Sequence, residues 1–335
     1  MNILEITDNK TIEWLLSEIN PSVRYFTLTE LLGKDDQNTE VIETRNNIMK
    51  VGIVPEILAH QKESSYWVSP TRFYHTKYTG TVWQLIILAE HGADSSDIRI
   101  KNACNYILKN SQDIESYGFA VNNSKKSGGG RHTEVIPCLT GNMLWSLIKL
   151  GFIDDERVSK GIEWIIKYQR TDDGSTFPPN EWPYDKFEIC WGKHSCHMGV
   201  VKSLKALSAI PETIRTKPIN DKIDALIEYL MIHHIYKKSH DLISIAKPGW
   251  LKPGFPLMYQ TDILEILDIL TDLKVKDARM NDAISILKSK QNKEKRWNLE
   301  NSYNGKMLVD IEEKGKPSRW ITYKALKILK HSIKR

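Results

Sequence analysis

Apolar residues recur at helical spacing along nearly the whole chain, and alternation of apolar and polar residues over more than about five positions is hard to find. This pattern predicts an all-α protein. The pattern also repeats about every 60 residues, which indicates a repeat architecture. Three clear copies share an arginine that opens a second helix and a glutamine that ends it: Arg99 and Gln112, Arg157 and Gln169, Arg279 and Gln291.

Each copy predicts a helical hairpin whose first helix is apolar and whose second helix is more charged. The apolar helices are expected to form an inner layer and the charged helices an outer one, because the layer that meets water carries the charge. We therefore expect a single-domain (α/α)6 toroid over residues 1–335, closed by an N-terminal helix at residues 9–19. The six hairpins are expected at residues 22–67, 75–119, 132–177, 194–236, 256–297 and 318–335.

Charge and hydropathy narrow the classes of partner. Lys and Arg (47) exceed Asp and Glu (42) by five, and both signs are interspersed, so no nucleic-acid partner is expected. No window approaches the roughly 20 apolar residues that a membrane span requires. The N-terminus is acidic and polar, unlike a signal peptide, which predicts a cytoplasmic protein. The four cysteines, Cys104, Cys138, Cys190 and Cys196, are then expected to be reduced thiols.

The expected site lies at one mouth of the barrel. The inner helices would run parallel, so their N-termini would converge there and favour negative charge. Candidate catalytic residues near these N-termini are His75, Tyr78, Arg131, His132, Glu134, His194 and Asp262, and candidate ligand-binding residues are Arg24, Lys77, Trp83, Trp191, Tyr259 and Trp320. The alternative interpretation is that these groups cap helices and bond to one another across the barrel.

The outer helices end in a glutamine that is followed by a turn and an aromatic residue. The four copies are Gln61 with KESSYW, Gln112 with DIESYGF, Gln169 with TDDGSTF and Gln291 with NKEKRW. This ending resembles the QW-type repeat of the terpenoid cyclase and protein prenyltransferase superfamily, which includes the squalene cyclases and has the α/α-toroid fold. The resemblance implies an enzyme, a transferase or cyclase, that acts on an isoprenoid or another anionic ligand in the central cavity.

The segment at residues 187–199, FEICWGKHSCHMG, is the candidate metal site. Thiol, imidazole and carboxylate groups at this density suit a metal ion or proton transfer. The pair formed by Glu188 and Cys190 is similar to the Asp-x-Cys pair with which protein prenyltransferases bind zinc, and His194 and His197 lie close behind it. Zinc is therefore the candidate cofactor. The later histidine of that family is replaced here by Trp320.

Three other functions fit the same residues. A cyclase would use Asp262 as its general acid, although the DxDD motif of class II cyclases is absent. A carbohydrate-active enzyme, of the polysaccharide lyase or hydrolase kind, would neutralise a uronate with Lys77 or Arg131 and move a proton with His75, Tyr78, His132, Glu134 or His194. A binding protein without turnover is the third. The expected partner is thus an isoprenoid, a diphosphate or a carbohydrate, and the sequence carries no mark of an oligomer.

Overall fold

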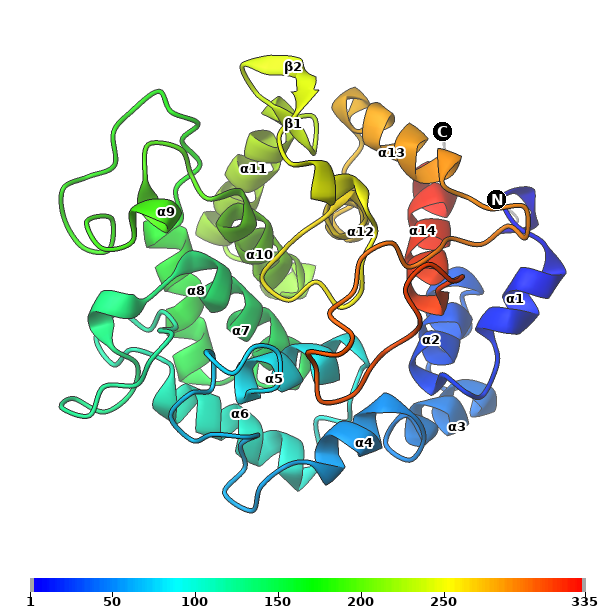
Figure 1. Ribbon diagram of the computed structural model, residues 1–335, viewed down its shortest axis with the longest axis horizontal. Coiled ribbons are helices and arrows are strands. Elements are labelled where there is room, and N and C mark those ends of the chain that lie inside the picture. Colours follow the sequence, from blue (N-terminus) through cyan, green and yellow to red (C-terminus); the bar gives the residue numbers. More distant parts are fainter. Residues whose placement is uncertain (1–2, 333–335) are drawn as a thin grey trace. The chain divides into compact units, whose positions relative to one another are not determined.

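The computed structural model describes residues 3–332, which form paired helices and one small hairpin of strands (Figure 1). Cα packing groups the chain into two compact units. Unit 1 comprises Met1–Ala59, Met231–Leu257 and Thr261–Arg335, and unit 2 comprises His60–Leu230 and Met258–Gln260. The prediction of one domain with six numbered hairpins stays a prediction. Its last hairpin, residues 318–335, includes residues 333–335, which lie outside the described residues.

Unit 2 contains three successive helix pairs and one short extra helix. These are α5 (Thr81–Glu90), α6 (Ile98–Asn110), α7 (Pro137–Lys149), α8 (Glu156–Tyr168), α9 (Glu188–Trp191), α10 (His197–Ser208) and α11 (Lys217–Ile232). The last two residues of α11 belong to unit 1. Every residue of α7 except Lys149 is buried, whereas α8 buries one face through residues such as Val158 and Ile165. The predicted alternation of a buried and a half-exposed helix is therefore confirmed.

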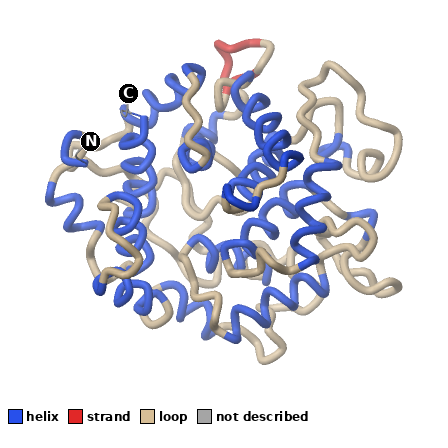
Figure 2. Tube along the Cα trace, turned by 180° about the vertical axis from the view of Figure 1, so that it is seen from behind, coloured by secondary structure: helices blue, strands red, loops and turns tan. Residues whose placement is uncertain are grey.

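Unit 1 contains the two ends of the chain and the strands. Its elements are α1 (Asn9–Leu15), α2 (Pro21–Phe26), α3 (Thr39–Ile48), α4 (Ile53–Ala59), β1 (Lys237–Lys238), β2 (Asp241–Ile245), α12 (Ile263–Asp272), α13 (Asn281–Ser289) and α14 (Arg319–Ser332). Within the described residues β1 and β2 are the only strands, and they pair antiparallel in the hairpin drawn red in Figure 2. The predicted fold class, an all-α toroid type built from inner and outer helices, is confirmed in its helices and their pairing.

The glutamines that recur in the sequence repeat make equivalent hydrogen bonds in the structure. In three copies the side-chain amide donates to a backbone carbonyl at or just before the start of the next outer helix: Gln61 to Arg99 (3.1 Å), Gln112 to Arg157 (2.8 Å) and Gln291 to Ile6 (3.0 Å). The aromatic residue that follows donates its backbone N–H to a threonine hydroxyl of the next inner helix: Trp67 to Thr81 (3.2 Å), Phe119 to Thr140 (2.9 Å) and Trp297 to Thr322 (3.0 Å). These bonds tie a repeat to the next one along the chain, except that the Gln291 amide ties its repeat back to the segment before α1.

The side-chain contacts of Gln169 differ from those of the other three glutamines. Its amide donates to the carbonyl of the adjacent Arg170 (2.8 Å), and its carbonyl oxygen accepts from the Ser203 hydroxyl (3.2 Å). A long segment, residues 170–196, separates α8 from α10 and contains α9. This insertion changes the geometry of the turn, so the glutamine contacts its own loop and the next inner helix.

The N-terminal helix is shorter than predicted but lies where it was expected. Residues 9–19 were expected to be helical, and α1 ends at Leu15 because the Asn20 side chain caps α2 by accepting from the Val23 N–H (3.1 Å). Within unit 1, α1 packs against α14 (Figure 1). The Arg319 guanidinium lies 4.6 Å from the Trp14 ring centroid and donates to the Trp14 carbonyl. Each helix within the described residues is too short or too polar to cross a bilayer.

Candidate functional site

The candidate site in unit 2 begins with the loop that precedes α5. The Trp83 indole donates to the Tyr74 carbonyl (3.0 Å), and the buried Gln84 amide donates to the Tyr78 carbonyl (3.0 Å). A Cβ on Gly80 would lie 2.3 Å from the Thr76 hydroxyl oxygen, so only glycine fits this turn. These contacts hold the loop on the first turns of α5 and fix the tyrosines.

Three aromatic rings surround the ammonium group of Lys77, whose side chain is otherwise exposed. Its Nζ lies 4.5 Å from the Tyr259 ring centroid, 4.9 Å from that of Tyr74 and 5.9 Å from that of Trp83. Tyr78 stacks on Tyr259 at 6.4 Å with an interplanar angle of 13°. We call Tyr74, Lys77, Tyr78, Trp83 and Tyr259 the Lys77 cluster. Ring faces attract a cation without neutralising it, so the cluster keeps a positive charge.

The segment that carries Tyr259 is held by a buried amide. Asn142, in α7, donates from its side chain to the Met258 carbonyl (3.0 Å). A buried side-chain amide that bonds to a backbone carbonyl fixes that segment relative to its own helix. The long contact between sequence positions 142 and 258 therefore places Tyr259 within the Lys77 cluster.

Two thiols next to this cluster stay protonated at neutral pH. Burial, followed by the neighbouring Cys196 and Cys190, raises the pKa of Cys138. Burial also raises the pKa of Cys190 to about 12, with Cys196 as the second cause. Burial, together with Cys138, raises the pKa of Tyr74. The thiolate is the nucleophilic form of cysteine, so these two thiols are uncharged, and Lys77 supplies the charge of the cluster.

A second arrangement in unit 2 pairs a histidine with a buried carboxylate. His132 Nδ1 lies 2.8 Å from an Asp113 carboxylate oxygen, and the Asp113 side chain is 2% exposed. The imidazole also stacks on Trp182 at 4.1 Å with an interplanar angle of 12°, and the Trp182 indole donates to the His132 carbonyl. Such a contact fixes the imidazole's tautomer and orientation, as in proton-transfer sites.

The other residues predicted before α7 bond to one another. The Arg131 guanidinium pairs with Glu134 at 2.5 Å, and the second Glu134 oxygen accepts from the Asn122 amide (2.8 Å). Both contacts lie within one loop. His75 is exposed beside the cluster, with its ring 5.5 Å from that of Tyr74.

The predicted metal donors do not converge within the described residues. Glu188 is exposed, His194 faces Asp173 at 3.6 Å, and the His197 ring packs 5.9 Å from that of Tyr229. No group of three His, Cys, Asp or Glu side chains in residues 3–332 is arranged to hold a metal ion. Zinc at this segment stays a prediction, which metal analysis of the purified protein would test.

Two of the residues predicted to bind a ligand, Trp191 and Trp320, pack against other aromatic rings. Trp191 is 2% exposed and packs between Trp164 and Tyr184 in unit 2. In unit 1, Trp320 is 1% exposed and stacks on Phe255 at 4.3 Å.

The two remaining predicted residues also belong to unit 1. Arg24 pairs with Glu40 at 2.8 Å. The Asp262 carboxylate accepts from the N–H groups of Glu265 and Gly254, both at 2.8 Å, which is the contact pattern of a helix cap.

Sequence reasoning missed Tyr74, Asp113 and Trp182. Asp113 and Trp182 lie in turns without helical periodicity, so no pattern assigns them to a site. Tyr74 directly precedes the predicted His75, and it was not selected because the neighbouring side chains are more reactive. The signal that was present for Asp113 is its place next to Gln112, at the end of an outer helix.

Comparisons with known proteins give low similarities. A structure described as an unsaturated glucuronyl hydrolase specific for heparin is similar over 97% of this chain and 89% of its own, with 13% identity and a TM-score of 0.46. A type II terpene cyclase, MstE from Scytonema, is similar over 96% of this chain and 98% of its own, with 12% identity and a TM-score of 0.43. No protein-family model and no curated protein sequence matches the chain. Scores this low carry no argument about its activity, which has to come from its own residues.

Proposed function

We propose that the protein is an enzyme that binds a small molecule in which an anionic group is joined to an apolar chain, such as an isoprenoid diphosphate. The observation that carries this proposal is the Lys77 ammonium, which lies against three aromatic rings. No carboxylate of the described residues forms an ion pair with Lys77. An anion entering the cluster gains a charge-assisted contact with Nζ, and the ring faces cover its apolar part.

The uncharged groups near the Lys77 cluster support an apolar ligand over a purely ionic one. The protonated thiols of Cys138 and Cys190 and the phenol of Tyr74 present weakly polar groups with no charge. An apolar chain against such groups loses its contact with water at little electrostatic cost. Aromatic faces would also favour positive charge that develops in the chain during transfer or cyclisation.

The test is a binding titration of the full chain, followed by tryptophan fluorescence, with farnesyl diphosphate, farnesol and inorganic pyrophosphate as probes. Farnesyl diphosphate is expected to bind most tightly, because it alone satisfies both the ammonium and the rings. Lys77→Met should weaken its binding about tenfold, the loss of one contact to a charged group. Lys101→Met, an exposed lysine of α6, is the matched control and should bind as the wild type does. Equal affinities for Lys77→Met and wild type would rule the proposal out.

A second candidate function, action on an acidic carbohydrate, is favoured by the pair of Asp113 and His132. Asp113 holds one imidazole nitrogen of His132, and Trp182 stacks on that imidazole. A histidine held in this way is suited to general acid or base catalysis, and Lys77 would neutralise a uronate.

The test of this candidate is turnover of an unsaturated uronate disaccharide. His132→Gln should lower the rate at least about 100-fold, the usual contribution of a general acid or base. His60→Gln, an exposed histidine of the same unit, is the control and should leave the rate unchanged. If wild-type protein does not turn the disaccharide over while it binds farnesyl diphosphate, the carbohydrate function is excluded.

A further inference from the structure

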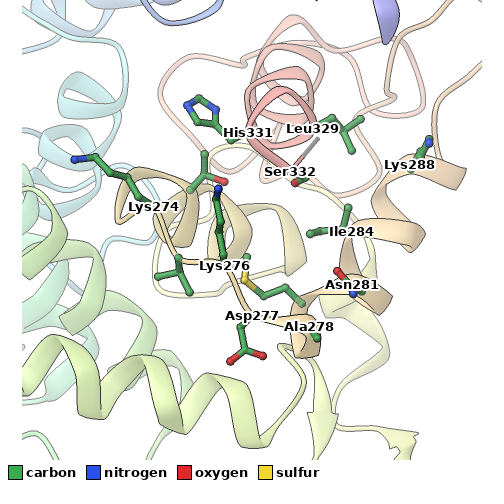
Figure 3. A pocket seen from close by; sticks show the side chains of 13 residues that line it. Lys274, Lys276, Asp277, Ala278, Asn281, Ile284, Lys288, Leu329, His331 and Ser332 are labelled. Carbon is green, nitrogen blue, oxygen red and sulfur yellow. The ribbon is translucent and has the colours of Figure 1, made fainter. Parts of the chain in front are cut away.

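The basic groups of unit 1 differ in whether the protein itself supplies their partners. A pocket of about 710 Å³, where the turn after α12 meets the start of α13 and the end of α14, is lined by Lys274 and Lys276 (Figure 3). Both lysines already take part in another interaction. Asp277, in the same lining, forms an ion pair with Arg279 at 2.7 Å. These charged groups therefore have partners within the fold.

Two arginines of the same unit lie against one indole ring. The guanidinium carbon of Arg296 lies 4.2 Å from the Trp14 ring centroid, and that of Arg319 lies 4.6 Å from it. Trp14 belongs to α1, Arg296 to the turn after α13, and Arg319 is the first residue of α14. We call these three residues the Trp14 cluster. The indole attracts both cations but does not neutralise them.

The two guanidinium groups have few acceptors for their N–H groups. A guanidinium carries donors on every one of its nitrogens and has no acceptor. Among residues 3–332, the one hydrogen bond from either side chain runs from Arg319 Nε to the Trp14 carbonyl (3.2 Å). Their one ion pair in the same range joins Arg296 to Glu294 at 3.6 Å, and Arg296 Nε is buried there without an acceptor. Most of these donors are therefore left to water or to a ligand.

The neighbouring carboxylates compensate these two charges only in part. Glu294 is 66% exposed, and a surface ion pair of this kind contributes little. Glu312 caps α14 with both carboxylate oxygens, which accept from the Ser318 hydroxyl and from the Arg319 N–H (2.6 Å). Burial lowers the pKa of Arg319; Glu312 opposes this effect, and the like charge of Arg296 adds to it. An anion that contacts both arginines would relieve their mutual repulsion.

We propose that the Trp14 cluster binds a phosphate group. A phosphate dianion matches the two guanidinium charges, and its oxygens accept from planar guanidinium groups in pairs. The contacts with Trp14 already hold both side chains in place, so little side-chain freedom is lost when the phosphate binds. Lys295 and Lys316, both exposed and close in sequence to the arginines, add to the positive potential. The site is built from unit 1 alone and shares no residue with the Lys77 cluster, so it does not depend on the function proposed above.

Isothermal titration of the full chain with inorganic phosphate and with acetate tests this proposal. Wild-type protein is expected to bind phosphate more tightly than acetate, whose single charge matches only one guanidinium. Arg296→Gln and Arg319→Gln should each weaken phosphate binding about tenfold, the loss of one contact to a charged group. Arg45→Gln, an exposed arginine of α3, is the matched control and should bind as the wild type does. Lys77→Met, which changes only the other cluster, should also leave phosphate binding unchanged.

The variant Glu294→Gln separates a binding role of the arginines from a structural one. It removes the carboxylate that competes for Arg296, at an exposed position, so phosphate binding should tighten about two- to fivefold. Unchanged phosphate affinity in this variant would assign the arginines a structural role and overturn the proposal. Absence of phosphate binding by the wild type, or equal affinity of the wild type and the Arg296→Gln/Arg319→Gln double variant, would overturn it as well.

Discussion

Two lysines, one in each unit, are held in opposite ways. Lys327, in α14, is 8% exposed and lies between three carboxylates: Asp272 (2.6 Å), Asp268 (2.9 Å) and Glu30 (3.2 Å). Burial lowers its pKa, but these carboxylates, Asp268 above all, hold it well above the usual 10.5. Lys77 is exposed and contacts ring faces. The charge of Lys327 is neutralised within the fold, whereas the charge of Lys77 remains available to a ligand.

This difference separates a structural charge from a candidate functional one. A buried ion pair contributes to stability only while all its partners are present, because removing one leaves an uncompensated charge in the core. A cation on ring faces at the surface contributes little to stability. Substitutions at the two lysines should therefore affect different measurements.

The largest effect is expected from Lys327→Met. Removing the ammonium leaves Asp268 with Lys324, at 3.2 Å, as its one cationic partner among residues 3–332. The free energy of unfolding should fall by about 3–5 kcal/mol, measured by urea denaturation. Lys293→Met, at an exposed position, should change it by less than about 0.5 kcal/mol. A loss below about 1 kcal/mol at Lys327 would mean that this network does not hold unit 1 together.

The same network predicts an acid-dependent loss of stability. Burial raises the pKa of Asp268, but Lys327 and Lys324 together hold it below the usual 3.8. Because the folded pKa is the lower one, this carboxylate stabilises the fold above about pH 3.8, and the contribution is lost as pH falls through the folded pKa. Asp272 acts with the opposite sign, since burial raises its pKa. Urea midpoints measured from about pH 5 to about pH 2 should fall less steeply in Asp268→Asn than in the wild type; parallel curves would contradict the assignment.

A third prediction concerns the Cys190 thiol. Since the pKa of Cys190 is about 12, its thiolate is scarce at pH 8. Alkylation of Cys190 by iodoacetamide, followed by mass spectrometry of the native protein, should be at least about tenfold slower than that of a free cysteine. The unfolded protein supplies the reference rate. Rapid alkylation of the native protein would show an activated thiol and would restore the nucleophile or metal role predicted for this residue.

The smallest effect on stability is expected from Lys77→Met. An exposed cation on aromatic rings contributes about 0.5–1 kcal/mol, so the free energy of unfolding should change by less than about 1 kcal/mol. Urea denaturation alongside Lys327→Met gives the comparison directly. A loss as large as that of Lys327→Met would make Lys77 a structural residue.

The sequence was sufficient for the helices and their pairing because these depend on local patterns. The turn before an outer helix is an example: Asp97, Asp155 and Asp277 each accept from the backbone N–H of the arginine two residues later, and the same Asp-x-Arg spacing was visible in the sequence. The end of α1 at Leu15 was not predicted, because the apolar pattern continues past it. The helix stops there because the Asn20 side chain caps the start of α2.

The site was only partly predictable because its contacts are distant in sequence. Lys77, Tyr78, Trp83 and Tyr259 were expected at a site and do lie together, yet Tyr259 depends on the Asn142 contact, which no local pattern shows. His132 was expected, but its partner Asp113 lies 19 residues earlier in a turn. Conversely, thiol, imidazole and carboxylate groups are concentrated at residues 187–199 in the sequence. In the structure these side chains face different neighbours and do not converge on one point.

The most direct test of the account is a crystal structure of the protein grown with farnesyl diphosphate. We predict that the diphosphate lies within hydrogen-bond distance of Lys77 Nζ and that the prenyl chain packs against the rings of Tyr74 and Tyr259. Diphosphate density elsewhere in the protein, with Lys77 still against its rings, would contradict the claim that this lysine holds its charge for a ligand.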